Sequence, residues 1–310
     1  MVNKPTDEQR IEATQMGINL IPTSNAEHLA GILSKNSDFH IRYIEKNKDG
    51  KKVFPDGEIY INISRFDEGK TVVLHSGAPS PNDGIVELEF ILGMLKERQI
   101  NNVELFITYF PYGKQDLAFL DGEINIAETL IKRWINCYGI KKIYIIDAHF
   151  KGREWVDKYP IEHMYSVSIL KKAALNKYPG IFFVAPDAGS ARRNKLPGFL
   201  KKRNNSYNIE ISCDENFGKS INGKIVGVID DMIETGGTMV GVCKKCKELG
   251  ASEVIALVTH GVLESGIEKI RDIYDDLFLT NTIQRDSANV DISNLIADSL
   301  QIYGQNRKNN

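Results

Sequence analysis

The feature that most constrains the fold of this chain is a repeated alternation of short apolar segments with amphipathic helical segments. The apolar segments are rich in Val, Ile and Phe, as buried strands are, and span residues 71–75, 102–108, 142–146, 181–185, 224–229 and 253–259. Helical periodicity fills residues 83–97, 125–137, 238–249 and 263–274. Strands that alternate with helices form mainly parallel sheets, so the sequence predicts an α/β protein with helices flanking its sheets.

Length and charge narrow the class of protein. A chain of 310 residues is long enough for two hydrophobic cores. A formal net charge of -2 is unlike the basic excess of a dedicated nucleic-acid-binding protein. No apolar run reaches the roughly 20 residues that a bilayer span needs, and residues 1–15 lack the apolar core of a signal peptide. We therefore expect a cytoplasmic protein that binds neither nucleic acid nor a membrane.

Two of the four cysteines have the spacing of a redox or metal motif. Four cysteines are too few to form a disulfide framework in a chain of this length. Cys243 and Cys246 are separated by two lysines inside a helical pattern, with no second ligand pair near them in the sequence. Because free cysteine is commonly a small core residue, we expect two partly buried, reduced thiols.

An acidic pair followed by a glycine-rich turn stands between the last two predicted strands. Asp230 and Asp231 end a strand, where carboxylates suit ribose hydroxyls, directly or through a divalent cation. A Thr-Gly-Gly-Thr turn follows: its glycines let the backbone turn tightly, and its threonines cap a helix whose N-terminus favours an anion. The residues expected to bind a ribose 5-phosphate are Asp230, Asp231, Glu234, Thr235, Gly236, Gly237 and Thr238.

This segment resembles the phosphoribosyl-diphosphate loop that type I phosphoribosyltransferases share with ribose-phosphate diphosphokinases. The match covers residues 228–238, Val-Ile-Asp-Asp-Met-Ile-Glu-Thr-Gly-Gly-Thr. Glu234 departs from the pattern, because these families usually carry Asp there. The longer carboxylate changes the contacts on the ribose side and leaves the phosphate side intact.

Segments outside this loop favour the diphosphokinases. Residues 54–58 resemble the loop that reaches the adenine of ATP across a subunit interface, although Pro55 and Gly57 are also consistent with a plain turn. Residues 109–116, Tyr-Phe-Pro-Tyr-Gly-Lys-Gln-Asp, resemble a second ATP segment, with Lys where Arg is usual. Residues 122–123 continue that match in a form closer to the archaeal type. The resemblance implies ATP binding by Phe54, Asp56, Glu58, Lys114, Gln115 and Asp116.

Further matches indicate metal ligands and show how much of the chain the resemblance covers. Asp-Ala-His at residues 147–149 and Pro-Asp-Ala-Gly-Ser at residues 186–190 resemble segments whose His and Asp bind magnesium, which implies His149 and Asp187 as Mg²⁺ ligands. Residues 79–83 with Glu87, 259–262 and 280–283 match other segments of the family. The resemblance runs from about residue 18 to residue 300, nearly the whole chain.

The resemblance implies two phosphoribosyltransferase type I-like domains, each a mainly parallel sheet flanked by helices. We expect an N-terminal, ATP-side domain at residues 16–150 plus 290–305, and a C-terminal, ribose-phosphate-binding domain at residues 151–289. The implied reaction transfers the diphosphoryl group of Mg-ATP to the C1 hydroxyl of ribose 5-phosphate, giving phosphoribosyl diphosphate and AMP. An ATP loop that serves a neighbouring subunit implies a homo-oligomer, at least a dimer.

The catalytic loop departs most from the family. A Lys and an Arg are expected there, but counting from Gly189 places the Lys position near Glu210, within the polar segment 194–218, which is expected to be a functional or disordered loop. Either Lys202 or Lys201 takes this role, with Arg203 and Arg193 as the other catalytic candidates, or the pair is missing. These departures leave two alternatives open: transfer to a modified acceptor such as ADP-ribose, or a catalytically silent regulatory paralogue.

Overall fold

The chain folds into two compact units, seen in a computed structural model that describes residues 17–67, 69–203 and 209–305. One unit holds the described residues up to Met164 together with those from Ser293, and the other holds Tyr165–Ile292. Each is an α/β unit with a parallel sheet, as the sequence predicts. Among the described helices, none is long and apolar enough to cross a membrane.

The first unit contains a six-stranded parallel sheet in the order β2-β1-β3-β4-β5-β6. Its strands are β1 (Ile18–Pro22), β2 (Phe39–Ile41), β3 (Thr71–Ser76), β4 (Val103–Tyr109), β5 (Ile143–Ile146) and β6 (Ile161–Met164). Its helices are α2 (Glu27–Leu33), α3 (Pro81–Glu97), α4 (Ile126–Tyr138) and α10 (Ser293–Gln305), with short 3-10 turns at Ser24–Ala26 and Val156–Lys158.

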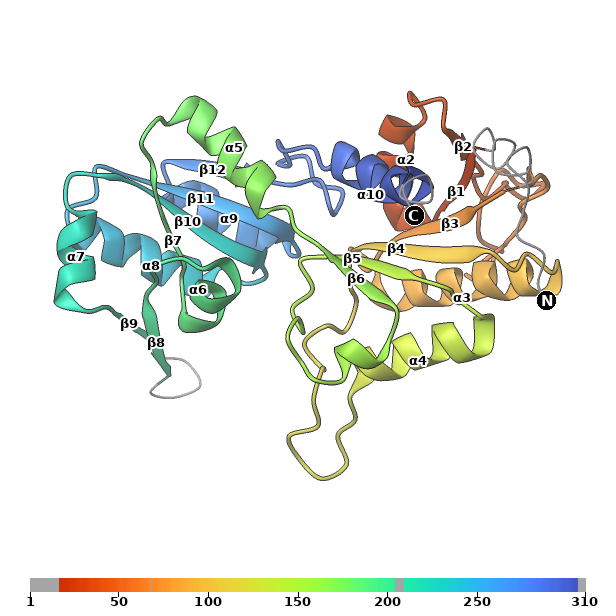
Figure 1. Ribbon diagram of the computed structural model, residues 1–310, viewed down its shortest axis with the longest axis horizontal. Coiled ribbons are helices and arrows are strands. Elements are labelled where there is room, and N and C mark those ends of the chain that lie inside the picture. Colours follow the sequence, from red (N-terminus) through yellow and green to blue (C-terminus); the bar gives the residue numbers. More distant parts are fainter. Residues whose placement is uncertain (1–16, 68, 204–208, 306–310) are drawn as a thin grey trace. The chain divides into compact units, whose positions relative to one another are not determined.

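Alternate residues of the central strands face two helical layers. Val73, Leu105 and Ile145 share a core with the apolar side chains of α3 and α4, among them Leu88 and Trp134. Figure 1 shows α3 and α4 along one face of the sheet and α2 and α10 on the other face. Because both faces are covered, the central strands are predominantly apolar, which is why they can be recognised in the sequence.

The second unit contains a four-stranded parallel sheet in the order β12-β11-β10-β7. Ile255 and Leu257 of β11 pack with α5 on one face, and Ala256 packs with α8 and α9 on the other. The elements are α5 (Val167–Lys177), β7 (Phe182–Val184), α6 (Ala188–Asn194), β8 (Leu200–Arg203), β9 (Ile209–Ser212), α7 (Glu215–Ile221), β10 (Ile225–Ile233), α8 (Gly237–Glu248), β11 (Glu253–Gly261), α9 (Glu264–Ile273) and β12 (Asp276–Leu279).

The described residues of the segment 194–218, which are 194–203 and 209–218, include regular elements that its polar composition does not suggest. β8 and β9 form an antiparallel ribbon, with Leu200 opposite Ser212, and α7 follows it. Asp214 caps α7 by accepting a hydrogen bond from the backbone N–H of Phe217 at 2.9 Å. Ile211 packs against the core of the second unit. The sequence does not reveal these elements, because two short strands and one short helix carry little periodicity.

The division between the two units differs from the predicted one at residues 151–164 and 290–292. β6 pairs with β5, Ile143 lying opposite Ile161, so residues up to Met164 stay with the first sheet. Val290 forms a bridge with Thr280, which keeps it in the second unit until α10 begins at Ser293. Backbone pairing, which local composition does not reveal, decides both positions.

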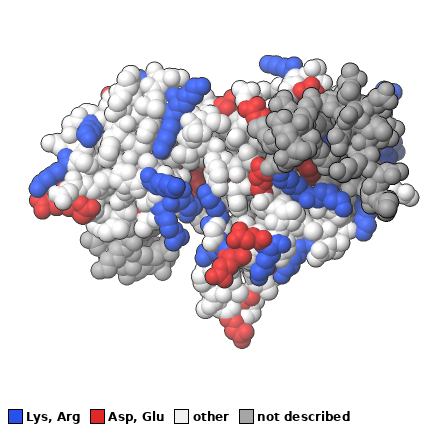
Figure 2. All heavy atoms as spheres, in the orientation of Figure 1, with Lys and Arg blue, Asp and Glu red and all other residues white. Residues whose placement is uncertain are grey.

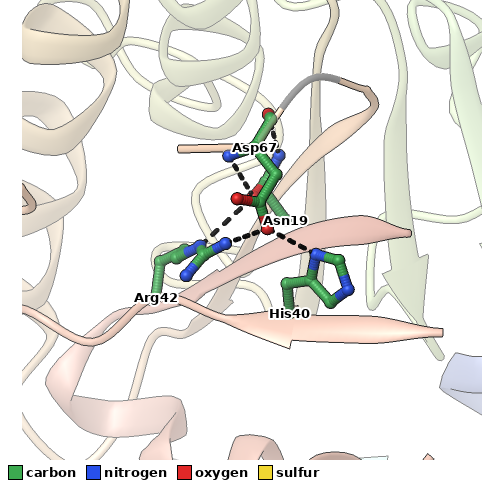
Figure 3. Close-up of polar contacts among 4 residues, drawn as sticks. All are labelled: Asn19, His40, Arg42 and Asp67. Carbon is green, nitrogen blue, oxygen red and sulfur yellow. Dashed lines mark hydrogen bonds and ion pairs between the residues drawn. The ribbon is translucent and has the colours of Figure 1, made fainter. Parts of the chain in front are cut away.

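A polar cluster fixes the β2 edge of the first sheet (Figure 3). His40 lies 2.6 Å from the carboxylate of Asp67, Arg42 pairs with the same carboxylate, and Asn19 donates to the backbone carbonyl of Asp67 at 2.8 Å. Asn19 is the second residue of β1 and lies opposite Thr71, the first residue of β3, so the cluster lies toward the amino ends of these two strands. This is the end opposite the one at which α/β sheets bind their ligands.

The two cysteines with motif spacing lie inside the second core. Cys243 and Cys246 are free and buried on α8, as expected of core thiols. Burial raises the pKa of Cys243 to about 11 and that of Cys246 to about 12. Thiols with pKa values this high stay protonated at neutral pH, and a protonated thiol is a poor nucleophile and a poor metal ligand, so the pair is structural.

Candidate active site

The predicted ribose-phosphate residues lie at the carboxyl end of β10. The strand continues through the acidic pair: Asp230 pairs with Val258 and Met232 with His260 of β11. Asp230 and Asp231 therefore sit on paired backbone rather than on a loop. Glu234 and Thr235 follow as exposed residues, and Gly236 is the N-cap of α8.

Two glycines close this loop against α9. Gly236 has a φ of 75°, which glycine adopts without strain, and a Cβ there would lie 3.1 Å from the carbonyl oxygen of Gly266. A Cβ on Gly266 would lie 1.9 Å from the carbonyl oxygen of Glu234. The start of α8 thus lies directly against the start of α9, and this contact fixes the first turn of α8 and leaves Gly237 exposed.

The acidic residues behind this loop form an electrostatically coupled group. Burial, followed by the carboxylates of Asp231 and Asp187, raises the pKa of the Asp230 carboxyl well above its usual range. Asp231 pairs with Arg193 of α6, whose Nη2 lies 3.2 Å from Oδ2 of Asp231. Asp187 caps α6 by accepting a hydrogen bond from the backbone N–H of Ser190 at 2.8 Å. The start of α6 therefore faces the end of β10.

The predicted catalytic residues fall in two places. Arg193 lies beside Asp231, at the sugar-phosphate loop. Lys202 and Arg203 lie on β8, and their side chains are outside the part of the chain that the structure describes. The strand register places Lys202 directly opposite Glu210, the position near which the family's Lys was expected.

In the first unit, the predicted ATP segment follows β4. Tyr112 has a φ of 57°, and the backbone N–H of Gln115 donates to its carbonyl at 3.0 Å, which forms a tight turn. Lys114 and Gln115 are exposed on this turn. Asp116 is buried, and its carboxylate accepts a hydrogen bond from Nε of Arg153 at 2.7 Å. The three predicted ATP-binding residues thus differ in accessibility.

His149, the predicted metal ligand of this unit, lies beside that turn. It is exposed, just past the end of β5, where Asp147 has a φ of 42°. A Cβ on Gly113 would lie 3.9 Å from Cβ of His149. The carboxyl ends of β4 and β5 therefore bring His149 and the 112–116 turn together, as neighbouring parallel strands do.

The other predicted ATP segment, residues 54–58, is a surface turn between β2 and β3. Val53 and Ile59 form an antiparallel bridge, and Gly57 has a φ of 93° at the tip. The ring of Phe54 is 42% exposed and stands edge-on to Tyr60, while Asp56 and Glu58 are exposed. The plain-turn interpretation and the ATP-loop interpretation both fit this geometry.

Buried polar residues lie behind the ends of β1 and β3. Glu87 of α3 accepts hydrogen bonds from the backbone N–H and the hydroxyl of Ser24, at 2.8 and 2.6 Å, and burial raises its pKa. His75 is fully buried, with Nδ1 3.1 Å from the hydroxyl of Thr23. Burial lowers the pKa of His75 to about 3, so this histidine stays neutral.

Metal ligation is supported only in part by the described geometry. Among residues 17–67, 69–203 and 209–305, no three His, Cys, Asp or Glu side chains are arranged to hold a metal ion. His149 belongs to the first unit and Asp187 to the second, so each is described within its own unit. Mg²⁺ is commonly held by one or two carboxylates together with substrate phosphates, and the carboxylate of Asp187 is a donor of that kind.

One residue of the site was missed from the sequence. Arg153 lies in the connection between β5 and β6, 37 residues from its partner Asp116. No local pattern links the two positions, and only the fold brings them into contact.

Two family models match most of the chain between them. The family model described as the N-terminal domain of ribose phosphate pyrophosphokinase matches residues 18–139, and that of the phosphoribosyl synthetase-associated domain matches residues 189–307. Over 94% of this chain and 99% of the other, the fold resembles the crystal structure of phosphoribosylpyrophosphate synthetase from Mycobacterium smegmatis, with a TM-score of 0.77 and 21% identity.

Curated relatives carry one name. The ribose-phosphate pyrophosphokinase of Pyrococcus abyssi is 26% identical over 294 residues, which cover 91% of this chain and 98% of the relative. That of Thermococcus kodakarensis is 30% identical over 244 residues, which cover 75% of this chain and 84% of the relative. The chain belongs to the ribose-phosphate pyrophosphokinase family, an enzyme family also called the ribose-phosphate diphosphokinases.

Proposed function

We propose that this protein transfers the diphosphoryl group of ATP to ribose 5-phosphate in a Mg²⁺-dependent reaction. The C1 hydroxyl oxygen bonds to the β-phosphorus as the bond to the α-phosphate breaks, so the products are phosphoribosyl diphosphate and AMP. One observation supports this proposal most strongly. Asp230 and Asp231 lie near the end of β10, whose backbone pairs with β11, and the N-terminus of α8 follows them, held against α9 by close glycine contacts.

On the sugar side, the two halves of this loop have different tasks. The backbone N–H groups and hydroxyls of residues 235–238, at the start of α8, bind the 5-phosphate. Asp230 and Asp231 accept hydrogen bonds from the ribose hydroxyls, and Glu234 extends the same acidic side. A sugar that lacks the 5-phosphate loses the contacts at the helix start and is a poor substrate.

On the nucleotide side, Lys114 and Gln115 bind ATP from the turn after β4, and Phe54, Asp56 and Glu58 contact the adenine from the surface turn. His149 and Asp187 are the protein ligands proposed for Mg²⁺, with substrate phosphates completing its shell. When bound, the ion neutralises charge on the phosphate oxygens. The protein side chains then hold the hydroxyl and the phosphate chain in line, which is most of what this chemistry needs.

Lys202 and Arg203 stabilise the negative charge on the migrating diphosphoryl group. The pairing of Lys202 with Glu210 supports this assignment, because it puts a basic residue beside the position where one was expected. Since the surface turn at residues 54–58 is exposed, its side chains are accessible to a second copy of the chain. We therefore propose that the protein works as a homo-oligomer, at least a dimer.

The test is AMP release from Mg-ATP with three acceptors: ribose 5-phosphate, ribose and ADP-ribose. We expect release with ribose 5-phosphate, little with ribose, and a loss of release when EDTA removes the metal. If AMP is released only with ADP-ribose, the acceptor is ADP-ribose and the reaction is still a diphosphoryl transfer. An absence of AMP with every acceptor, in a protein that still binds ATP, would contradict the proposed activity and favour a regulatory role.

A further inference from the structure

The residue that gives most information beyond this assignment is Arg153. It lies in the connection between β5 and β6, on the turn that follows His149. Its Nε donates to Oδ2 of Asp116 at 2.7 Å and its Nη2 donates to Oδ1 at 3.4 Å. The guanidinium therefore grips the carboxylate with two adjacent donors, which is the geometry that fixes its plane.

The two partners differ sharply in exposure. The side chain of Asp116 is 4% exposed, whereas that of Arg153 is 42% exposed. A guanidinium carries five N–H donors, and the carboxylate of Asp116 takes two of them. The remaining donors belong to a side chain that reaches solvent, so Asp116 holds the base of the guanidinium while its outer edge stays accessible.

The backbone around Arg153 is anchored on both sides. Phe150 and Trp155 are buried, and their ring centroids lie 5.0 Å apart. The indole N–H of Trp155 donates to the backbone carbonyl of Asp116 at 3.1 Å, and the backbone N–H of Arg153 donates to the carbonyl of Phe150 at 3.1 Å. The connection is thus fastened to the 112–116 turn through backbone as well as side chains, and Arg153 is held in place before any ligand arrives.

The charge of the loop after β4 explains why a cation is needed there. This loop projects away from the sheet (Figure 1), and acidic side chains mark its tip (Figure 2). Between residues 114 and 123 it contains one basic residue, Lys114, and three acidic ones, Asp116, Asp121 and Glu123. These residues give the loop a net negative charge beside the turn proposed to bind the polyphosphate of ATP, and the positive charge of Arg153 offsets part of it.

We propose that Arg153 is a phosphate-binding residue of the nucleotide site, and that Asp116 is its positioning residue rather than a direct ligand of ATP. The inference rests on the proposed function, because it assumes that residues 112–116 bind ATP. A guanidinium fixed by a carboxylate and open on its other edge matches a phosphate group bidentately, which an ammonium such as that of Lys114 does not. Arg153 would then bind the phosphate chain with two parallel hydrogen bonds, and Lys114 would bind it with a single positive charge.

The experiment measures equilibrium binding of Mg-ATP and of adenosine to the full-length protein by calorimetry, with no acceptor present. Arg153→Gln is expected to weaken ATP binding about tenfold or more, as loss of a charged hydrogen bond does. Adenosine binding should not change, since adenosine has no phosphate. Arg153→Lys should restore part of the ATP affinity, because it keeps the charge and loses the fork. ATP affinity equal to wild type in Arg153→Gln would overturn the proposal.

A second variant separates binding from a purely structural role. Arg153→Gln leaves the buried carboxylate of Asp116 unpaired, which destabilises the fold by itself. The double variant Asp116→Asn, Arg153→Gln removes both charges, so its thermal midpoint should recover while ATP affinity stays low. Recovery of ATP affinity together with the midpoint would show that Arg153 only neutralises Asp116.

A matched control is Arg133→Gln on α4. Arg133 pairs with Glu89 at 2.7 Å and is 55% exposed, so this variant removes another Arg–carboxylate pair from the same unit. Its ATP affinity should match wild type. The binding comparison also separates the two proposals: a protein that binds ATP through Arg153 but releases no AMP would contradict the proposed activity alone.

Discussion

Arg193 and Asp231 form an ion pair at the sugar-phosphate loop, with Nη2 of the one 3.2 Å from Oδ2 of the other. Their side chains are 23% and 12% exposed, so the contact is partly shielded from solvent. The pair ties α6 to the end of β10, two elements that both contribute residues to the proposed site. We therefore propose that Arg193 orients the carboxylates proposed to bind ribose, and that it does not act on the migrating group.

This relationship predicts a selective loss in Arg193→Ala. Asp231 would lose the cation that orients it, and the KM for ribose 5-phosphate should rise about tenfold, the effect of one charged contact. The KM for ATP should change much less. Steady-state kinetics with each substrate varied in turn provides the measurement. A lower kcat with both KM values unchanged would contradict this prediction and indicate a catalytic role for Arg193.

Lys202→Ala is expected to lower kcat by about a hundredfold while ribose 5-phosphate binding stays close to wild type, because the lysine acts on charge that develops in the transition state. Lys219→Ala, which removes an exposed lysine paired with Glu215 on α7, is the matched control and should leave turnover unchanged. If Lys201→Ala shows the large loss and Lys202→Ala does not, the role belongs to the neighbouring residue.

Gly266→Ala should disturb the phosphate loop from outside it. The added Cβ would lie 1.9 Å from the carbonyl oxygen of Glu234, so the loop must shift. We expect a higher KM for ribose 5-phosphate and a loss of stability of about 1–3 kcal/mol, the usual cost of overpacking. Gly31→Ala is the comparison, since a Cβ at this position of α2 would meet no other described part of the chain within 4 Å. Urea denaturation and kinetics on both variants check the prediction, and equal stability of the two would contradict it.

His75 predicts a dependence of stability on acid. The unfolded histidine takes up a proton near its ordinary pKa of 6.5, whereas the folded one, with its pKa lowered by burial, does so only near pH 3. Between these values the unfolded state binds more protons, so stability falls as the pH is lowered. Each pH unit in that window costs about 1.4 kcal/mol.

The measurement compares urea denaturation of wild type and His75→Gln at pH 7 and pH 5. Wild type should lose about 2 kcal/mol more than the variant between the two pH values. Groups other than His75, such as the carboxyl of Glu87, titrate in both proteins, so their contributions largely cancel in the comparison. An identical loss in the two proteins would mean that His75 is protonated in the folded state at pH 5.

The parts of the fold that the sequence predicts are those buried on two faces. β3, β4, β10 and β11 are rich in apolar residues, and each begins within two residues of the start of its predicted range. β2 has only three residues, and β6, Ile-Glu-His-Met, is half-buried along its whole length. Such edge strands are defined by the backbone partners they pair with, which no local pattern contains.

The site divides in a similar way. The loop from Asp230 to Thr238 is predictable because its function requires glycines, carboxylates and a helix start in consecutive positions. The contacts of Asp116 with Arg153 and of Asp231 with Arg193 join residues separated by 37 and 38 positions. Long-range pairs of this kind follow from the fold, and no local sequence pattern predicts them.

The pairing of β10 with β11 continues past the acidic pair to Ile233, which lies opposite Gly261. The backbone that carries Asp230 and Asp231 is therefore ordered when the protein folds and not when the sugar binds. Most of the conformational entropy that a flexible loop would lose at each turnover has already been lost. A substrate that arrives and leaves once per catalytic cycle thus meets a receptor that does not need to reorganise for it.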